Sequence, residues 1–222
     1  MHDHIAFVHT SPVHVRTFDG LMAELAPELR VRHVVAKELL ALAMKVGTND
    51  PGLAEHIQRR MREAAATGAR VVVCTCSTIG GVVEQSPTDG RYVAARIDRA
   101  MADRAVTAGS RVLVVAALES TLAPTYELLM DSARTLGQEL RVDCLLVPDA
   151  WAHFVAGETQ AYVDCVVAAV AAAVPPPGVV VLAQASMAPA TPLLEVIGIN
   201  AVSSPRLGVQ RAIAQFQAQA AR

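Results

Sequence analysis

The sequence has few aromatic residues and no long run of charge of one sign. Aromatic residues make up 4% of the 222 residues, and 19 lysines and arginines nearly balance 21 aspartates and glutamates. An aromatic stacking platform for nucleic-acid bases is therefore not expected, and neither is the basic surface that binds phosphate backbones. These shortages argue against nucleic acid as the main partner, and the even charge argues against an anionic membrane surface.

Long apolar segments are also missing. The longest candidate, residues 163–174, contains Asp164 and ends before Pro175, so it falls short of the ~18 apolar residues expected of a membrane span. The N-terminus lacks the charged, apolar and small-residue regions of a secretory signal peptide. Four cysteines at irregular spacing do not suggest a disulfide framework. We therefore expect a cytoplasmic protein without a membrane segment.

Hydrophobic residues make up 53% of the chain, which is enough for a substantial core. Apolar runs rich in β-branched residues predict buried strands, and helical periodicity follows most of them. The predicted strands are residues 5–8, 31–35, 71–76, 111–117, 142–147 and 179–183. The predicted helices are residues 18–25, 39–43, 53–68, 101–108, 124–136, 162–174 and 205–222.

Local signals place some of the helix ends. Asp50 before Pro51 predicts an N-cap with proline in the first turn, and Asp98 predicts a second N-cap. Residues 79–95 are punctuated by glycine and proline. They predict a short helix and a loop, and the alternative is a mobile cover over the neighbouring strand end.

The order strand, helix, strand, helix, strand occurs twice. We therefore predict an α/β fold of two similar lobes, each a parallel sheet flanked by helices. The first lobe is residues 1–97, with the C-terminal helix 205–222 packing on it, and the second lobe is residues 98–204. Each lobe has polar residues after its first and third strands, and we expect these ends to meet in a cleft.

The third strand ends in the most reactive cluster, Cys76-Ser77-Thr78, followed by Gly80-Gly81. Ligands of open α/β sheets bind at the carboxyl ends of strands. A thiol beside backbone N–H groups can be held partly as thiolate, and hydroxyl groups can donate to a carboxylate. Cys76 is thus the candidate catalytic residue, although a cysteine often packs as a small hydrophobe, which is our expectation for Cys74.

Two segments resemble the site elements of the cofactor-independent aspartate/glutamate/hydantoin racemase superfamily. They are Cys76-Ser77-Thr78 and Leu182-Ala183-Gln184-Ala185-Ser186-Met187; Arg96-Ile97-Asp98 and the stretch from Ser120-Thr121 to Pro124-Thr125 are also similar to such sequences. The resemblance implies two facing cysteines: one thiolate removes the proton beside a carboxylate, and the other thiol returns a proton to the opposite face. It also implies a small carboxylate substrate, a homodimer and no cofactor.

The chain departs from this pattern at Gln184, which stands where the second cysteine is expected. An amide donates and accepts hydrogen bonds but exchanges no proton near neutral pH. One hypothesis is therefore a racemase or isomerase with the single thiol Cys76, and a second is a lyase similar to arylmalonate decarboxylase. A third is a carboxylate-binding protein without activity. Cys144 and Cys165 are expected away from strand ends.

His9 is an alternative second acid/base, because an ordinary histidine pKa of ~6.5 suits proton exchange. The alternative for His9 is a structural hydrogen bond; His33 shows no comparable placement, and His14 is expected at the surface. Neither metal-ligand spacing nor a phosphate loop is present in the sequence. The residues expected to bind substrate are His9, Thr10, Ser11, Ser77, Thr78, Thr121, Gln184, Ala185 and Ser186.

Several of these residues could instead cap helices. No cationic residue is expected at the strand ends to bind a second carboxylate, so aspartate or glutamate is not favoured over an acid with an uncharged side chain or a hydantoin.

Overall fold

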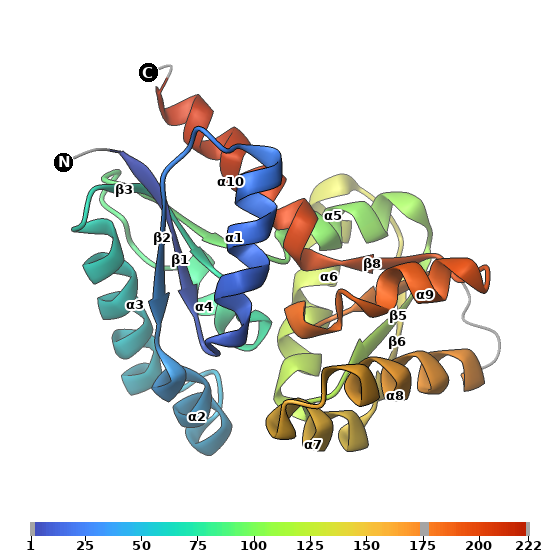
Figure 1. The fold of residues 1–222 in the computed structure, drawn as a ribbon. Coiled ribbons are helices and arrows are strands. Elements are labelled where there is room, and N and C mark those ends of the chain that lie inside the picture. The colour runs from blue at the N-terminus through green and yellow to red at the C-terminus, as the bar shows by residue number, and fades with distance from the viewer. Residues whose placement is uncertain (1–2, 174–177, 221–222) are drawn as a thin grey trace. The chain divides into compact units, whose positions relative to one another are not determined.

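The computed structural model describes residues 3–173 and 178–220. The chain divides into two compact units. Unit 1 is Met1–Asp98 together with Pro205–Arg222, and unit 2 is Arg99–Ser204. Each unit holds one four-stranded parallel sheet flanked by helices (Figure 1). The predicted fold class, an α/β protein of two similar lobes with parallel sheets, is confirmed.

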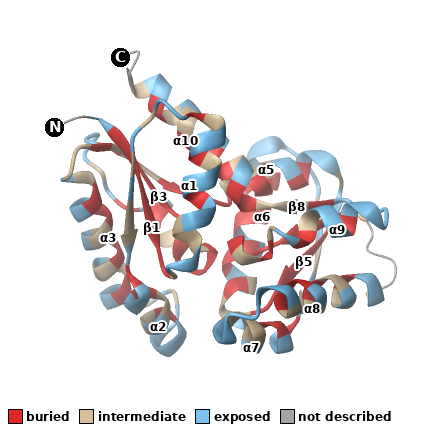
Figure 2. Ribbon diagram, viewed as in Figure 1, coloured by how far each residue is buried: buried red, intermediate tan, exposed pale blue. Residues whose placement is uncertain are grey.

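The sheet of unit 1 has the strand order β2-β1-β3-β4, and all its pairs are parallel. Its strands are β1 (His4–His9), β2 (Val31–Val35), β3 (Ala69–Cys74) and β4 (Val93–Arg96). The central strands β1 and β3 are almost entirely buried (Figure 2). Their β-branched side chains suit this position because a parallel strand is covered on both faces.

Side chains of β1 alternate between two apolar layers. Ala6 and Val8 pack with Leu39 and Leu53 of the helices on one face. Phe7 belongs to the layer on the other face, with side chains of α1 and α10. The helices of unit 1 are α1 (Val13–Leu25), α2 (Lys37–Val46), α3 (Pro51–Ala65), α4 (Gly80–Glu84) and α10 (Ser204–Ala220), and the short 3-10 helix η1 is Ser77–Ile79.

Helix α10 returns the chain to unit 1 after unit 2 is complete. Its residues Val209, Ala212 and Phe216 join the same apolar layer as Phe7. A Cβ atom on Gly208 would collide with the carbonyl oxygen of Ile97, so glycine is required at this helix contact.

The sheet of unit 2 repeats the plan with the strand order β6-β5-β7-β8. Its strands are β5 (Arg111–Ala116), β6 (Arg141–Leu146), β7 (Val179–Leu182) and β8 (Ala201–Ser203). Its helices are α5 (Arg99–Ala108), α6 (Leu122–Leu136), α7 (Pro148–Ala156), α8 (Thr159–Ala172) and α9 (Ala190–Val196), with the 3-10 helices η2 (Glu119–Thr121) and η3 (Ala185–Met187). Leu113, Val115 and Leu182 pack with side chains of α8 and α9.

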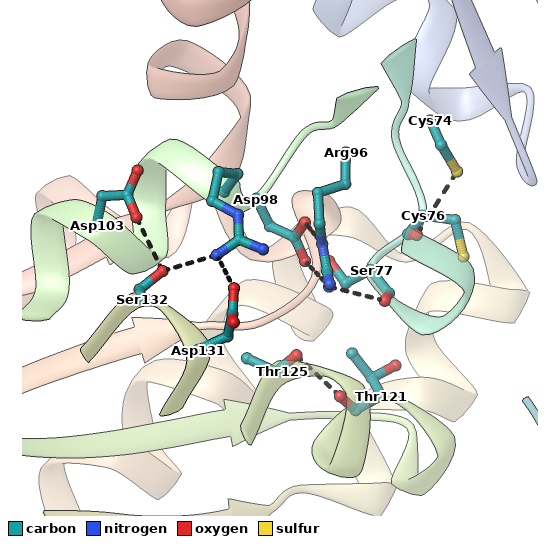
Figure 3. A network of polar contacts seen from close by, with 11 residues as sticks. Cys74, Cys76, Ser77, Arg96, Asp98, Asp103, Thr121, Thr125, Asp131 and Ser132 are labelled. Atoms are coloured by element: carbon teal, nitrogen blue, oxygen red, sulfur yellow. Dashed lines mark hydrogen bonds and ion pairs between the residues drawn. The ribbon is translucent and has the colours of Figure 1, made fainter. Parts of the chain in front are cut away.

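A polar network joins helices α5 and α6 of unit 2 (Figure 3). Arg99 donates to Asp131 over 2.8 Å and to the Ser132 hydroxyl over 3.1 Å. The Ser132 hydroxyl in turn lies 2.8 Å from a carboxylate oxygen of Asp103. These contacts fix the first turn of α5 against α6.

The six predicted strands are present, and two short strands were missed. β4 and β8 have 4 and 3 residues, too few to show a period of two. Helices α7 and α9 were also missed. Residues 79–95 contain α4, a loop and the start of β4, close to the predicted short helix and loop.

Predicted helix ends can be compared with the structure at several points. The Asp50 side chain accepts a hydrogen bond from the Leu53 N–H at 2.8 Å, and Pro51 opens α3, as predicted. The predicted ends at Val174 and at residues 221–222 lie outside the described residues. No helix within residues 3–173 and 178–220 is long and apolar enough to cross a membrane.

Candidate active site

Cys76 and Gln184 occupy equivalent positions in the two units. Val8 pairs with Cys74 in unit 1, and Val115 pairs with Leu182 in unit 2. One residue further on, the Thr75 N–H donates to the Val8 carbonyl over 3.0 Å, and the Ala183 N–H donates to the Val115 carbonyl over 2.9 Å. Cys76 is the residue directly before η1, and Gln184 is the residue directly before η3. The alignment that puts an amide in the place of a second thiol therefore has a structural basis.

The Cys76 thiol lies two residues beyond the carboxyl end of β3 and is half-buried. Hydrogen bonds from the Thr10 and Thr78 hydroxyls and from the backbone N–H groups of Thr78 and Ile79 favour its thiolate form. Thr10 follows β1, whereas Thr78 and Ile79 lie in η1. The thiol is therefore surrounded by donors from two strand ends of one sheet.

Burial nevertheless outweighs these donors and raises the pKa of Cys76 above its ordinary value. The sequence-based expectation of a partly ionised thiol is wrong in this respect, because desolvation of the thiolate costs more than the hydrogen bonds return. Cys76 carries its proton at neutral pH and is suited to donate it. Burial also raises the pKa of Cys74, a core thiol as predicted, and the Cys74 sulfur donates to the Cys76 carbonyl over 3.7 Å.

A buried ion pair supports the turn that carries Cys76 (Figure 3). Arg96 donates to both carboxylate oxygens of Asp98, over 2.7 and 3.0 Å, and both side chains are buried. The Ser77 hydroxyl bonds to Asp98 as well, and Arg96 and Ser77 lower the pKa of Asp98 against the effect of burial. Gly80 lies against the Arg96 guanidinium, where a Cβ atom would come within 2.8 Å of Nε. The Asp98 carboxylate, predicted as a helix cap, thus serves this network.

In unit 2, the amide of Gln184 has a fixed orientation. Its Oε1 atom accepts the backbone N–H of Ala117 over 2.6 Å and that of Leu118 over 3.2 Å. The Nε2 atom makes no hydrogen bond within the described part of the chain, and the side chain is half-buried. Gln184 therefore presents two N–H donors, which suit a carboxylate or another anionic acceptor.

Other predicted binding residues of unit 2 lie at the same sheet edge. Ala185 and Ser186 belong to η3, and the Ser186 hydroxyl lies 2.8 Å from the Tyr162 hydroxyl. Thr121 is buried in η2, where its carbonyl accepts the Thr125 hydroxyl over 2.8 Å. Ser120 was not among the residues predicted to bind substrate. Its buried Oγ atom makes no hydrogen bond to any of the described residues. An unpaired buried hydroxyl at a strand end is a candidate ligand contact.

The structure places His9 at the end of β1, as expected, and inside unit 1. Its ring is fully buried, Nδ1 lies 2.8 Å from the Thr75 hydroxyl, and Nε2 lies 2.8 Å from Nδ1 of His33. Neither ring nitrogen remains for a substrate. His33 lies within β2, away from the strand end, and contacts His9 from there. His14, expected at the surface, is half-buried, and its ring lies 6.3 Å from that of His9.

The remaining predicted residues are Ser11, half-buried in the turn after β1, and the two other cysteines. Cys144 lies within β6 and Cys165 within α8, away from strand ends as expected. No cluster of three or more histidine, cysteine, aspartate or glutamate side chains that could hold a metal ion occurs in residues 3–173 and 178–220.

Comparisons with known proteins find similar solved structures but no matching family model or curated sequence. Aspartate racemase from Picrophilus torridus has a TM-score of 0.70 at 12% identity, over 99% of this chain and 95% of that chain. Allantoin racemase from Klebsiella pneumoniae has a TM-score of 0.63 at 16% identity, over 99% and 88%.

A mutant of arylmalonate decarboxylase in a sulfate-associated form has a TM-score of 0.57 at 16% identity, over 96% of this chain and 93% of that chain. Further solved structures of this kind include glutamate racemases. The resemblance indicated by the sequence is thus confirmed in the fold. This chain therefore shares its fold with solved aspartate, glutamate and allantoin racemases.

Proposed function

We propose that this chain is an enzyme that moves a proton at the carbon next to a carboxylate, with the Cys76 thiol as the only cysteine that carries it. The observation that supports this most directly is the placement of Cys76 at a strand end among four donors. A proton carrier must be held in one orientation, and the four donors around the Cys76 thiol support such a fixed orientation. The proposal places the protein in the racemase and isomerase class and requires no cofactor.

The proposed binding groups are those that offer hydrogen-bond donors. In unit 1 the hydroxyl groups of Thr10 and Thr78 hold the Cys76 thiol. In unit 2 the hydroxyl of Ser186 and the amide of Gln184 would donate to an anionic group; donors of this kind stabilise the enediolate that forms when the α-carbon loses a substituent. The amide cannot exchange protons near neutral pH, so unit 2 supplies no second thiol-like acid or base. The substrate class is a small α-substituted carboxylate with an uncharged side chain.

Deuterium exchange tests the proposal. Incubation with α-substituted carboxylates or hydantoins in D2O should place deuterium on the α-carbon, and Cys76→Ala should lower the rate about 10²- to 10⁴-fold, the usual contribution of a general acid or base. Cys144→Ser and Cys165→Ser are matched controls and should exchange at the wild-type rate. Saturable binding without exchange would indicate a carboxylate-binding protein and would contradict the proposal.

Decarboxylation is a second candidate, and the raised pKa of Cys76 favours it. A protonated thiol is a poor base, but loss of CO2 from an α-substituted malonate creates the carbanion without any base. The electron pair of the broken C–C bond forms the enediolate, the Cys76 proton goes to carbon, and water returns a proton to sulfur. Release of CO2 from malonates, with one deuterium incorporated per turnover in D2O, would favour this reaction over racemisation.

A further inference from the structure

A chain of hydrogen bonds links the surface of unit 1 to the residue before Cys76. The Thr75 hydroxyl lies 2.8 Å from Nδ1 of His9, and Nε2 of His9 lies 2.8 Å from Nδ1 of His33. Nε2 of His33 lies 2.8 Å from a carboxylate oxygen of Asp19, whose side chain is 59% exposed. We call Asp19, His33, His9 and Thr75 the relay.

The Asp19 carboxylate accepts the hydrogen bond that His33 donates from Nε2. Which of the other ring nitrogens donates depends on the tautomers of His9 and His33. The Thr75 hydroxyl also donates to the Val8 carbonyl over 3.3 Å. Burial, followed by the nearby His33 and His14, lowers the pKa of His9 to about 3, so its ring is neutral at pH 7. All four ring nitrogens of His9 and His33 have a hydrogen-bond partner.

The relay ties β1 to β3 beside the thiol. Val8 pairs with Cys74, so His9 lies beside Thr75 and Thr10 beside Cys76. The first of these two pairs is joined by the relay, and the second by the hydrogen bond from the Thr10 hydroxyl to the Cys76 sulfur. Two successive cross-strand contacts therefore hold the thiol in place.

Unit 2 shows that the sheet does not require this tie. At the positions equivalent to His9 and Thr75 it has Ala116 and Ala183, which carry no polar side-chain atoms. The residue equivalent to His33 is Cys144, which pairs with Val114 as His33 pairs with Phe7. Because unit 2 keeps the same strand register with alanines, the relay is an addition of the unit that carries the thiol.

We propose that His9, His33 and Asp19 are positioning residues for Cys76, which hold the ends of β1 and β3 so that Thr10 donates to the sulfur. The proposal rests on the proposed function for its catalytic value, whereas its effect on the thiol can be measured without a substrate. The relay acts through Thr75 and Thr10, and none of its three charged or titratable members touches the sulfur.

Few other titratable groups lie close enough to change the pKa of the Cys76 thiol or the contacts of His9. Near His9 they are His33 on β2 and His14 and Asp19 on α1. Near Cys76 they are Cys74 on β3 and the pair of Arg96, the last residue of β4, with Asp98. Variants of Asp19 and His33 leave Cys74, Arg96 and Asp98 unchanged.

The test is the rate at which iodoacetamide alkylates Cys76, measured against pH and assigned by mass spectrometry. Cys144→Ser and Cys165→Ser provide the background, and Cys74 is fully buried. Asp19→Ala and His33→Phe should raise the pH midpoint and slow alkylation at pH 8 about threefold to tenfold, because a weakened hydrogen bond to the thiolate costs up to about one pKa unit. His33→Phe preserves the ring stacking with Phe7 and His9.

Glu24→Gln is the matched control, because Glu24 is an exposed acid on the same helix that pairs with Arg206 outside the relay. Its pH midpoint should equal that of the wild type. Lower stability with an unchanged midpoint in Asp19→Ala would overturn the relay and leave the proposed function standing; Asp19 is exposed, so this variant decides the matter even where His33→Phe fails to fold. A shifted midpoint in a protein that exchanges no α-proton would support the relay and overturn the proposed function.

Discussion

In unit 1, the residue that begins the turn after the third strand is a half-buried thiol that keeps its proton. In unit 2, the equivalent position holds the Gln184 amide, whose oxygen accepts two backbone N–H groups that follow the neighbouring strand β5. One topology thus carries a thiol in one unit and an amide with two N–H groups in the other. The fold fixes the position of the group, and the side chain alone decides its chemistry.

The strands next to β3 and β7 also differ, since unit 1 has a charged side chain there and unit 2 does not have one at the equivalent position. Unit 1 places Arg96 beside Cys74 on the neighbouring strand and pairs it with Asp98, whereas unit 2 places Ser203 beside Leu182. A buried ion pair contributes little net stability compared with apolar packing, so the Arg96–Asp98 pair suggests a task other than folding. We infer that the polar contacts of unit 1 serve the turn that carries Cys76.

The substitution that makes the two units alike should have the largest effect on the rate of α-proton exchange. Cys76→Gln gives unit 1 the residue of unit 2 and should lower α-proton exchange about 10²- to 10⁴-fold, because the proton carrier is lost. The exchange rate in D2O is the measurement. Gln184→Cys is the matched control, which retains Cys76 and should retain measurable exchange; equal loss in both variants would show that the two positions do not differ in role.

Asp98→Asn should destabilise unit 1 selectively. It leaves the buried Arg96 without a counter-charge, at a cost of about 3–5 kcal/mol. Urea unfolding followed by hydrogen exchange should show the loss in peptides of unit 1 first. Asp131→Asn in unit 2 removes a half-exposed ion pair and should cost about 0–1 kcal/mol. Similar losses for the two variants would contradict the difference inferred between the units.

Gly208→Ala should also act on unit 1. The added methyl group meets the Ile97 carbonyl, and overpacking of this kind costs roughly 1–3 kcal/mol. Gly20→Ala lies on α1 with nothing within 4 Å of the new atom, so it should leave stability unchanged or raise it by about 0.5–1 kcal/mol. Thermal unfolding of both variants measures the contrast, and equal shifts would contradict the packing of α10 described above.

Much of this comparison was available from the sequence. Runs of valine predicted the central strands, and the polar residues after them located Cys76 and Gln184. The relay was missed because His9 and His33 are 24 residues apart and meet only through the pairing of β1 with β2. A histidine on each of two predicted neighbouring strands was the signal available. The raised pKa of Cys76 was also missed, because it depends on burial, which no local pattern reports.

Gln184→Ala should have a smaller effect, confined to unit 2. It removes the acceptor of two backbone N–H groups, and the cost is about 1–2 kcal/mol because water can reach a half-buried site. Gln184→Glu keeps an oxygen acceptor and should retain more of the stability while it weakens binding of an anionic substrate. Unfolding curves and binding titrations separate the two effects, and full anion affinity in Gln184→Glu would contradict the proposed role of Nε2.

Acidification should give the mildest change. The pKa of Asp98 is lowered in the folded protein, so its contribution to stability is present above the unfolded value of about 3.9 and is lost as pH falls through the folded value. Stability of unit 1 should therefore not fall on this account between pH 7 and about pH 5. In Asp98→Asn the further loss below that range should be absent, which unfolding measured against pH can test.

The return of α10 to unit 1 has a consequence for how the molecule is made. Val209, Ala212 and Phe216 complete an apolar layer whose other members are translated before residue 98. Nascent unit 1 therefore leaves the ribosome with one face of its sheet covered by α1 but not by α10, while the whole of unit 2 is translated before α10. Unit 1, which carries Cys76, is the first to be translated and the last to be completed. A premature stop after residue 204 would therefore remove α10 from unit 1 and leave the sequence of unit 2 whole.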